Sequence, residues 1–404
     1  MSVWNIFLLC LFLLAACRQQ KKEYEIDLEF AYSSRSQLML SEFVEHLEYV
    51  VLETKGNPID RDLKVYTSEK YLICIAFRQI YLFDRQTGHF IREIGKFGRG
   101  PGEYLATRYF DSNTQFVYAS GNGLNLLEYD LNGRVIRSIL LPQKEIVTQR
   151  EGDFFSDQWI LTNNIFLDKN TIVYYNENLV GDAKDRLLIV GENGNVINIF
   201  ANSNSFIQQN LSFTFGGSSL FYHHNGDTFF FENCVDTIYR VTKDKLIPHF
   251  NLRMGRYKPP YEKKGLLPLP RENPLRTQYF IFNNIGESYR FLFFNFFHQT
   301  NPMNPRYSFF GFYDKKSGKT KIADVNKIHG QIIVNDIDNF LNVQFPSWTI
   351  NEHNEIISYI EAFDIVEWFE TNPEKARNLP EHLQKLSKIQ PEDNPVVVIA
   401  TLKQ

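Results

Sequence analysis

The sequence has no excess of positive charge. It contains 43 Lys and Arg residues against 47 Asp and Glu residues, which gives a formal net charge of -4. Proteins that bind the phosphate backbone of nucleic acids carry a basic patch or stripe, and this sequence shows none. We therefore expect no nucleic-acid partner.

The common motifs of catalysis and metal binding are also missing. The sequence contains no G-x-S-x-G elbow, no H-E-x-x-H motif, no Cys-x-x-Cys pair and no EF-hand loop. It therefore identifies no catalytic residue, no cofactor-binding residue and no metal ligand. Whether the protein is an enzyme stays open at this point, and a non-enzymatic role is the favoured interpretation.

Cysteine is scarce, with four residues in a chain of 404. Cys10 lies in an apolar N-terminal run and Cys17 ends that run, so Cys74 and Cys234 are left for the folded part. Both lie in apolar runs typical of strands, where a Cys behaves as a small hydrophobic residue. We expect two unpaired thiols in the core.

The apolar run at residues 6–16 is too short to span a membrane. Its eleven apolar or small residues suit the central region of a signal peptide, whereas a membrane span needs about 20. The run ends in LAAC, which resembles a bacterial lipobox with Cys17 as the lipidated residue. We predict a signal peptide over residues 1–16, lipidation of Cys17 and a lipidated tether over residues 17–40.

These features predict a location in the bacterial cell envelope. Several acyl chains on one residue give a stable anchor, because each buried CH₂ contributes about 0.8 kcal/mol. The membrane is therefore an expected partner, through the lipid on Cys17. The first charges after this residue are basic, at Arg18, Lys21 and Lys22, whereas acidic runs at this point accompany surface export in some bacteria. We expect attachment to the outer membrane, with the periplasmic side favoured over the cell surface.

Aromatic residues are abundant. They make up 15% of the chain, with 36 Phe and 21 Tyr against 4 Met. Aromatic rings pack well on half-buried pleated surfaces, so this composition favours strands. The sequence predicts an all-β fold.

A repeat of about 46 residues organises the chain. Residues 71–93 read as two strands, a turn and a third strand, and residues 116–142 repeat this pattern with aligned apolar positions and an aligned Gly. Weaker copies lie at 186–200, 228–251, 289–322 and 330–368. This spacing is typical of propeller blades, which are four-stranded sheets that need neighbours on both faces.

We predict a six-bladed β-propeller over residues 41–404, most simply as a monomer. A propeller closes when a strand from one end of the chain completes the blade formed by the other end, which removes exposed sheet edges. Residues 46–53 and 395–402 are both suitable, and the sequence does not decide between them. Residues 379–389 place Leu and Ile at helical spacing, with Pro380 suited to the first helical turn, which predicts a short C-terminal helix that covers an edge or end of the propeller.

Residues 95–104, GKFGRGPGEY, carry a family resemblance. They are similar to the G-x-x-G-x-G-P-G-E-[FY] signature of the six-bladed β-propeller lipoproteins of Bacteroidota, which are related to NHL-repeat propellers. Further similar segments lie at 47–54, 235–240 and 393–398, so the resemblance spans the mature chain. It implies a fold and a cellular location but no specific activity.

The signature itself predicts a structural turn between two blades. Gly98, Gly100 and Gly102 allow tight backbone conformations, Pro101 fixes one φ angle, and Glu103 can accept backbone N–H bonds. A phosphate-binding loop is the alternative, but such a loop runs into a helix with a following Lys and Ser or Thr. The residues that follow here do not supply that pattern.

Two other segments have competing interpretations. His223 and His224 resemble a metal cluster, but adjacent residues on a strand point to opposite faces, and the following Asn225 and Gly226 are a hairpin signal. The aromatic run at residues 291–297 could stack on sugar rings, although apolar residues on both faces suit a sheet between two blades. We favour the hairpin and the core.

Two functional hypotheses follow. The first is a membrane-anchored binding or scaffold module, whose loops take a protein, peptide or glycan partner. The second is a metal-assisted hydrolase or lyase with calcium at the propeller channel, to which acidic residues such as Asp236 and Asp336 would have to converge. We favour the first and predict no cofactor.

Overall fold

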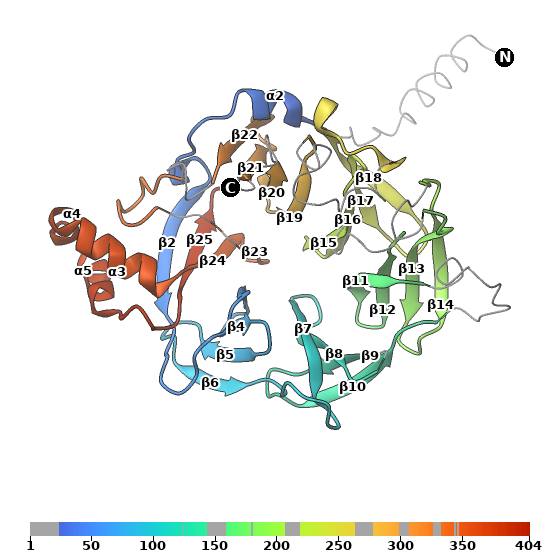
Figure 1. The fold of residues 1–404 in the computed structure, drawn as a ribbon, viewed down its shortest axis with the longest axis horizontal. Helices are drawn as coiled ribbons and strands as arrows, with labels where there is room; N and C mark the ends of the chain where they lie inside the picture. Colours follow the sequence, from blue (N-terminus) through green and yellow to red (C-terminus); the bar gives the residue numbers. More distant parts are fainter. Residues whose placement is uncertain are drawn as a thin grey trace, which may run out of the picture.

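The computed structural model describes residues 24–123, 125–143, 159–178, 181–206, 219–262, 278–298, 307–325, 333–342, 345 and 347–404. These residues form six sheets around a central axis, each with four consecutive antiparallel strands (Figure 1). The prediction of an all-β, six-bladed propeller is therefore confirmed.

In five blades the strands follow one another along the chain, with the first strand nearest the axis (Figure 1). Blades one and two consist of β3 (Lys64–Thr67), β4 (Tyr71–Ile75), β5 (Ile80–Asp84) and β6 (Phe90–Glu93), and of β7 (Tyr104–Asp111), β8 (Phe116–Gly121), β9 (Asn125–Tyr129) and β10 (Val135–Leu140). Blade three consists of β11 (Leu161–Asp168), β12 (Thr171–Asn176), β13 (Asp185–Gly191) and β14 (Val196–Ala201). Blades four and five consist of β15 (Ser219–His224), β16 (Asp227–Glu232), β17 (Thr237–Val241) and β18 (Leu246–Arg253), and of β19 (Ile281–Glu287), β20 (Phe291–His298), β21 (Tyr307–Asp314) and β22 (Lys319–Asp324).

Blade six joins the two ends of the chain. From the axis outward it consists of β23 (Thr349–Ile350), β24 (Glu355–Ile360), β25 (Val396–Leu402) and β2 (Val44–Val51). The strands β2 and β25 pair antiparallel, from Val44 opposite Leu402 to Val51 opposite Val396. Both candidate strands therefore close the ring, because β25 is the third strand of the blade and β2 is the outermost.

The sequence repeat corresponds to structurally equivalent positions. The aligned apolar segments are β5 and β9, the third strands of consecutive blades. The aligned glycines Gly88 and Gly133 have φ angles of +70° and +82° in the turns before the fourth strands. At Gly88 an added Cβ would lie 1.9 Å from the carbonyl oxygen of Val51, so the turn also packs against the closing strand.

Six apolar clusters hold the blades together, one at each boundary between neighbours. The strand β20 shows how one sheet serves two boundaries. Phe291 and Phe293 belong to the cluster shared with blade six, whereas Phe294 and Phe296 belong to the cluster shared with blade four. The core interpretation of this aromatic run is confirmed.

The packed part of the chain begins earlier than predicted. Residues 24–27 form β1 (Tyr24–Asp27), which pairs parallel with β18 as a fifth, outermost strand of blade four. The helix α2 (Leu28–Ser33) follows, and Ile26 and Leu28 are fully buried. The tether predicted over residues 17–40 is therefore wrong for residues 24–40, because alternate apolar side chains of this segment enter the core. Cys17 and the signal peptide lie outside the described residues.

The C-terminal region contains more helix than predicted. The helices α3 (Ala362–Thr371), α4 (Pro373–Arg377) and α5 (Glu381–Gln384) and the 3₁₀ helix η6 (Lys385–Lys388) lie between β24 and β25. The sixth repeat was predicted to extend to residue 368, but its strands before this insertion end at Ile360. Aromatic residues such as Phe363 and Trp368 occur in strands as well as in helices, so the segment that forms α3 also fitted the predicted repeat of strands.

The predicted C-terminal helix is confirmed, and its apolar side chains pack against the propeller. Leu379, Leu383, Leu386 and Ile389 all belong to the cluster between blades five and six, and the helices lie outside β2 (Figure 1). Two further short 3₁₀ helices are η1 (Leu40–Glu42) and η2 (Gly255–Tyr257). Among the described residues, none of the helices has the length and apolar character needed to cross a bilayer.

The two cysteines of the folded part are buried. Cys74 is 1% exposed in the cluster between blades six and one, and Cys234 is 5% exposed beside Tyr279. Burial raises the pKa of the Cys74 thiol, so this side chain stays neutral and serves as a small apolar residue.

The substitution Phe294→Ala tests the packing between blades. The side chain of Phe294 is fully buried in the apolar cluster between blades four and five. Its truncation is therefore expected to lower the free energy of unfolding by about 3–5 kcal/mol. Leu140→Ala is the control, since Leu140 is 71% exposed and should cost less than about 0.5 kcal/mol. Chemical denaturation measures both, and equal losses would contradict this account of the core.

Candidate functional site

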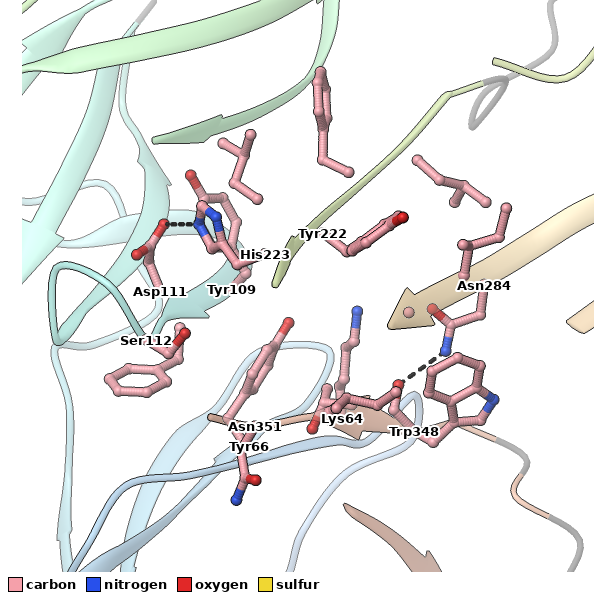
Figure 2. Close-up of a pocket in the computed structure, with 18 of the residues that line it drawn as sticks. Lys64, Tyr66, Tyr109, Asp111, Ser112, Tyr222, His223, Asn284, Trp348 and Asn351 are labelled. Carbon is pink, nitrogen blue, oxygen red and sulfur yellow. Dashed lines mark hydrogen bonds and ion pairs between the residues drawn. The ribbon is translucent and has the colours of Figure 1, made fainter. Parts of the chain in front are cut away.

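A cavity of about 270 Å³ lies where the innermost strands meet at the axis (Figure 2). Each blade contributes to its wall. The contributing residues include Tyr66 of β3, Asp111 of β7, Asn164 of β11, Tyr222 of β15, Asn284 of β19 and Thr349 of β23. Ligand sites of small molecules are concave and combine apolar walls with a few placed polar groups, and this cavity has that character.

Hydrogen bonds between neighbouring blades fix part of the wall. The Tyr109 hydroxyl donates to Asn164 Oδ1 at 2.9 Å, and Asn284 Nδ2 donates to the Trp348 carbonyl at 2.8 Å. Burial raises the pKa of Tyr109 well above its ordinary value, and the nearby charge of Asp111 adds to this effect. Tyr109 therefore remains a neutral phenol that holds blade two against blade three.

Asp111 and His223 meet from blades that are not neighbours. His223 Nε2 of blade four lies 3.1 Å from Asp111 Oδ2 of blade two, and Figure 2 shows the contact beside the cavity. The other oxygen of Asp111 accepts backbone bonds from Asn113 and Thr114, and His223 Nδ1 lies 3.2 Å from Thr228 Oγ1. Both polar ends of the pair are therefore engaged within the protein.

The hairpin interpretation of the paired histidines is confirmed. Asn225 and Gly226 connect β15 to β16 with φ angles of +55° and +76°. His223 and His224 contact different carboxylates, since His224 Nε2 lies 3.7 Å from Glu287 Oε1. They do not act together on one ligand.

Glu287 is the centre of a second polar cluster at the cavity. Its carboxylate lies 2.9 Å from His249 Nε2, 2.9 Å from Lys315 Nζ and 3.2 Å from the Tyr222 hydroxyl. Burial by itself raises the pKa of Glu287, but the hydrogen bond with His249 and the positive charges nearby outweigh it, so the pKa is lowered. The sequence could not reveal this cluster, because its members come from four separate strands and turns.

Acidic residues do not converge as a metal site would require. In the described ranges no group of three or more His, Cys, Asp or Glu side chains is placed to hold a metal ion. Asp236 pairs with Lys258 at 2.7 Å, and Asp336 Oδ1 accepts a bond from the Ser41 backbone at 2.9 Å. Neither carboxylate lines the cavity.

The glycine-rich signature connects β6 of blade one to β7 of blade two. Glu103 Oε2 accepts a bond from the Gly100 backbone N–H at 2.7 Å, and a Cβ on Gly98 would lie 2.0 Å from the same oxygen. Gly102, with φ of +73°, follows Pro101, and the Gly102 carbonyl accepts a bond from the Tyr129 hydroxyl. The loop therefore folds around its own carboxylate.

Two bulges occur in the innermost strands at the cavity. The register of β7 shifts between Thr107 and Tyr109, at Arg108, and the register of β19 shifts between Phe282 and Asn284, at Asn283. Both bulged residues line the cavity. Bulges re-aim side chains and are frequent beside functional sites, so these positions identify residues that sequence analysis missed.

Comparisons with known proteins agree with this architecture. The family model of the domain of unknown function DUF4934 matches residues 23–401. A crystal structure from Bacteroides fragilis NCTC 9343, described as a "putative exported protein", aligns with a TM-score of 0.67 at 16% identity, over 92% of this chain and 98% of that chain. The β-propeller domain of Cps50 (Swd1) from Myceliophteria thermophila aligns with a TM-score of 0.38 at 9% identity, over 88% and 100%. A search of curated proteins gives no match. The predicted six-bladed family is confirmed, and its relation to NHL-repeat propellers stays a prediction.

The Glu287 cluster predicts a specific dependence of stability on pH. Because its pKa is lower in the folded protein than in the unfolded chain, Glu287 stabilises the fold above about pH 4.3. This contribution is lost as the pH falls through the lower, folded pKa. Glu287→Gln is expected to cost about 3 kcal/mol at neutral pH, and the difference from the wild type should shrink in acid.

Urea denaturation between pH 3 and pH 7 measures this difference. Glu381→Gln is the matched control, because the side chain of Glu381 is 89% exposed and its removal should leave the curve unchanged. A Glu287→Gln penalty that stayed constant over this range would show that Glu287 contributes through packing and not through its charge.

Proposed function

The chain belongs to the family of the domain of unknown function DUF4934, and we propose that it is an exported, lipid-anchored binding module whose axial cavity holds the ligand. One observation carries the proposal. The innermost strands of all six blades line a single cavity, and hydrogen bonds between blades hold its wall in place. A preformed cavity binds without a large ordering cost.

The lining suits a polar ligand such as a glycan or a peptide. Amide groups of Asn164, Asn283 and Asn284 line the cavity together with the half-buried ring of Tyr66. Asn283 is exposed, and among the described residues no partner of its amide lies within hydrogen-bonding distance. Amides offer donors and acceptors together, and aromatic rings offer apolar faces.

The same cavity offers little for acid–base chemistry. Its buried carboxylates, Asp111 and Glu287, are each engaged by histidine side chains, and Glu287 also by Lys315. A general acid or base needs access to the reacting group and a pKa near the working pH. The pKa of Glu287 is instead lowered, which favours binding over hydrolysis as the role of the site.

Anchoring through Cys17 completes the proposal. The apolar run and LAAC sequence before this residue support export and lipidation, and an outer-membrane location facing the periplasm agrees with the basic residues that follow. Residues 17–23 separate the lipid from β1, and a chain of seven residues spans at most about 25 Å. The propeller would therefore stay close to the membrane.

Filling the cavity tests the binding site. Asn283→Trp adds a large ring at the cavity wall, so binding to an immobilised panel of oligosaccharides and peptides is expected to fall by about tenfold or more for every ligand of the wild type. Asn132→Trp, on an exposed turn, is the control and should bind like the wild type. Retained binding by Asn283→Trp, or no ligand for the wild type in the panel, would reject the cavity as the binding site.

Replacing Cys17 tests the anchor. In cells, Cys17→Ser is expected to move the protein from the membrane fraction to the soluble fraction and to abolish incorporation of labelled fatty acid, because the thiol is the site of acylation. Cys74→Ser is the control and should leave both readouts unchanged. Unchanged labelling and membrane retention in Cys17→Ser would refute lipidation at this residue.

A further inference from the structure

A second hollow lies beside the axial cavity, between blades one and two. Its volume is about 450 Å³, and its wall includes Phe77, Arg78 and Phe97. Lys64 and Arg108 line both hollows, so they stand where the cavity and the groove meet. A ligand longer than the cavity therefore has a route outward past these two cations.

Three cations line this route, and none of them has an ion-pair partner among the described residues. Within the described part of the chain, no carboxylate lies within 4 Å of the charged groups of Lys64, Arg78 or Arg108. Lys64 Nζ stands 5.5 Å from the Tyr66 ring and points into the cavity (Figure 2). Arg108 Nε donates to Ser120 Oγ at 2.7 Å, and its two terminal nitrogens have no partner among the described residues.

The acidic side chains nearby do not compensate these cations. The Asp111 and Glu287 carboxylates are already paired with His223 and with His249 and Lys315. Asp62 lines the groove, but it lies 3.9 Å from Arg61 Nε in an exposed pair. The carboxylates around the route are thus engaged elsewhere, and its three cations are left without an ion-pair partner among the described residues.

Arg78 is held in place by two aromatic rings. Its guanidinium carbon lies 4.9 Å from the Phe77 ring centre and 4.8 Å from the Phe97 ring centre. These rings are 40% and 42% exposed, so they lie at the surface of the groove and reach its wall. The two rings hold the guanidinium at the groove, and a guanidinium can bind a carboxylate in a bidentate manner.

We propose that the cavity and the groove form one site for an acidic oligosaccharide, in which Lys64, Arg78 and Arg108 bind the carboxylates of successive uronic-acid residues. The proposal rests on the binding function of the cavity and adds the class of ligand. Each uronic-acid residue has one carboxylate for a cation, several hydroxyls for the cavity amides and an apolar ring face for an aromatic side chain. A glutamate-rich peptide would match the cations, but it has no hydroxyls for the amide of Asn283.

Calorimetry with tetragalacturonate and its methyl ester tests the charge requirement. The two ligands differ only in their carboxylates. The wild type is therefore expected to bind the acid form and to bind the ester with an affinity that is lower by about tenfold or more. Added salt should weaken binding of the acid form only, because screening acts on the charged pairs. Equal affinity for acid and ester would overturn the proposal, and so would tighter binding of tetraglutamate than of tetragalacturonate.

Matched variants locate the site. Lys64→Gln with Arg108→Gln is expected to weaken binding of the acid form by about tenfold or more and to leave binding of the ester unchanged. Arg78→Gln is a second, independent variant on the exposed surface and should also weaken the acid form. Lys385→Gln, on an exposed side chain of η6, is the control for loss of a positive charge. Wild-type affinity in the Lys64 and Arg108 double variant would overturn the assignment.

The outcome separates this proposal from the proposed function. If Asn283→Trp abolishes binding of a neutral oligosaccharide or a peptide while tetragalacturonate does not bind, the cavity is the binding site and the acidic ligand is wrong. If no ligand depends on Asn283, both proposals fail. Unfolding free energies of all variants, measured by chemical denaturation, show whether a loss of binding reflects a loss of fold.

Discussion

The pairing of β2 with β25 is the interaction on which the other features of this protein depend. Each blade is apolar on both faces, as the strand β20 illustrates, so each blade needs a neighbour on both sides. Only a closed ring satisfies this need, because an open row of blades would leave two apolar faces in water. Closure joins residues 44–51 to residues 396–402 and so places blade six against blade one. Closure also fixes the width of the channel along the axis, and with it the size of the cavity.

Closure around an axis explains why the buried carboxylates of the cavity are paired. Side chains from six strands converge on a small volume, so buried carboxylates find partners there, as Asp111 does with His223 from a blade that is not its neighbour. These pairs hold the wall together and engage both buried carboxylates of the cavity. The cations at the junction of cavity and groove are not paired in this way, and under our proposal they bind the ligand. The polar groups of the cavity thus divide into those that build it and those that face a ligand.

The sequence predicted those features that arise from local patterns. The repeat identified β5 and β9, the Asn225–Gly226 pair identified a hairpin, and continuous apolar residues identified β20 as a strand buried on both faces. Features that depend on convergence in space could not be predicted, because Lys64, Arg108 and Asn283 lie far apart in the chain. The strand β1 was missed since four residues with alternating polarity also fit a solvated tether. Its parallel partner β18 follows more than 200 residues later, and no local signal specifies such a pairing.

The position of β1 has a consequence for how the molecule would sit at a membrane. This strand is the outermost of its sheet, so the polypeptide leaves the propeller at its rim and not at either end of the axis. Under the proposed anchoring, the tether would therefore join the ring at its outer side, and neither opening of the axial channel would lie at the point of attachment. If both the proposed anchor and the proposed ligand hold, an oligosaccharide would reach the junction of cavity and groove without first passing between the protein and the lipid surface.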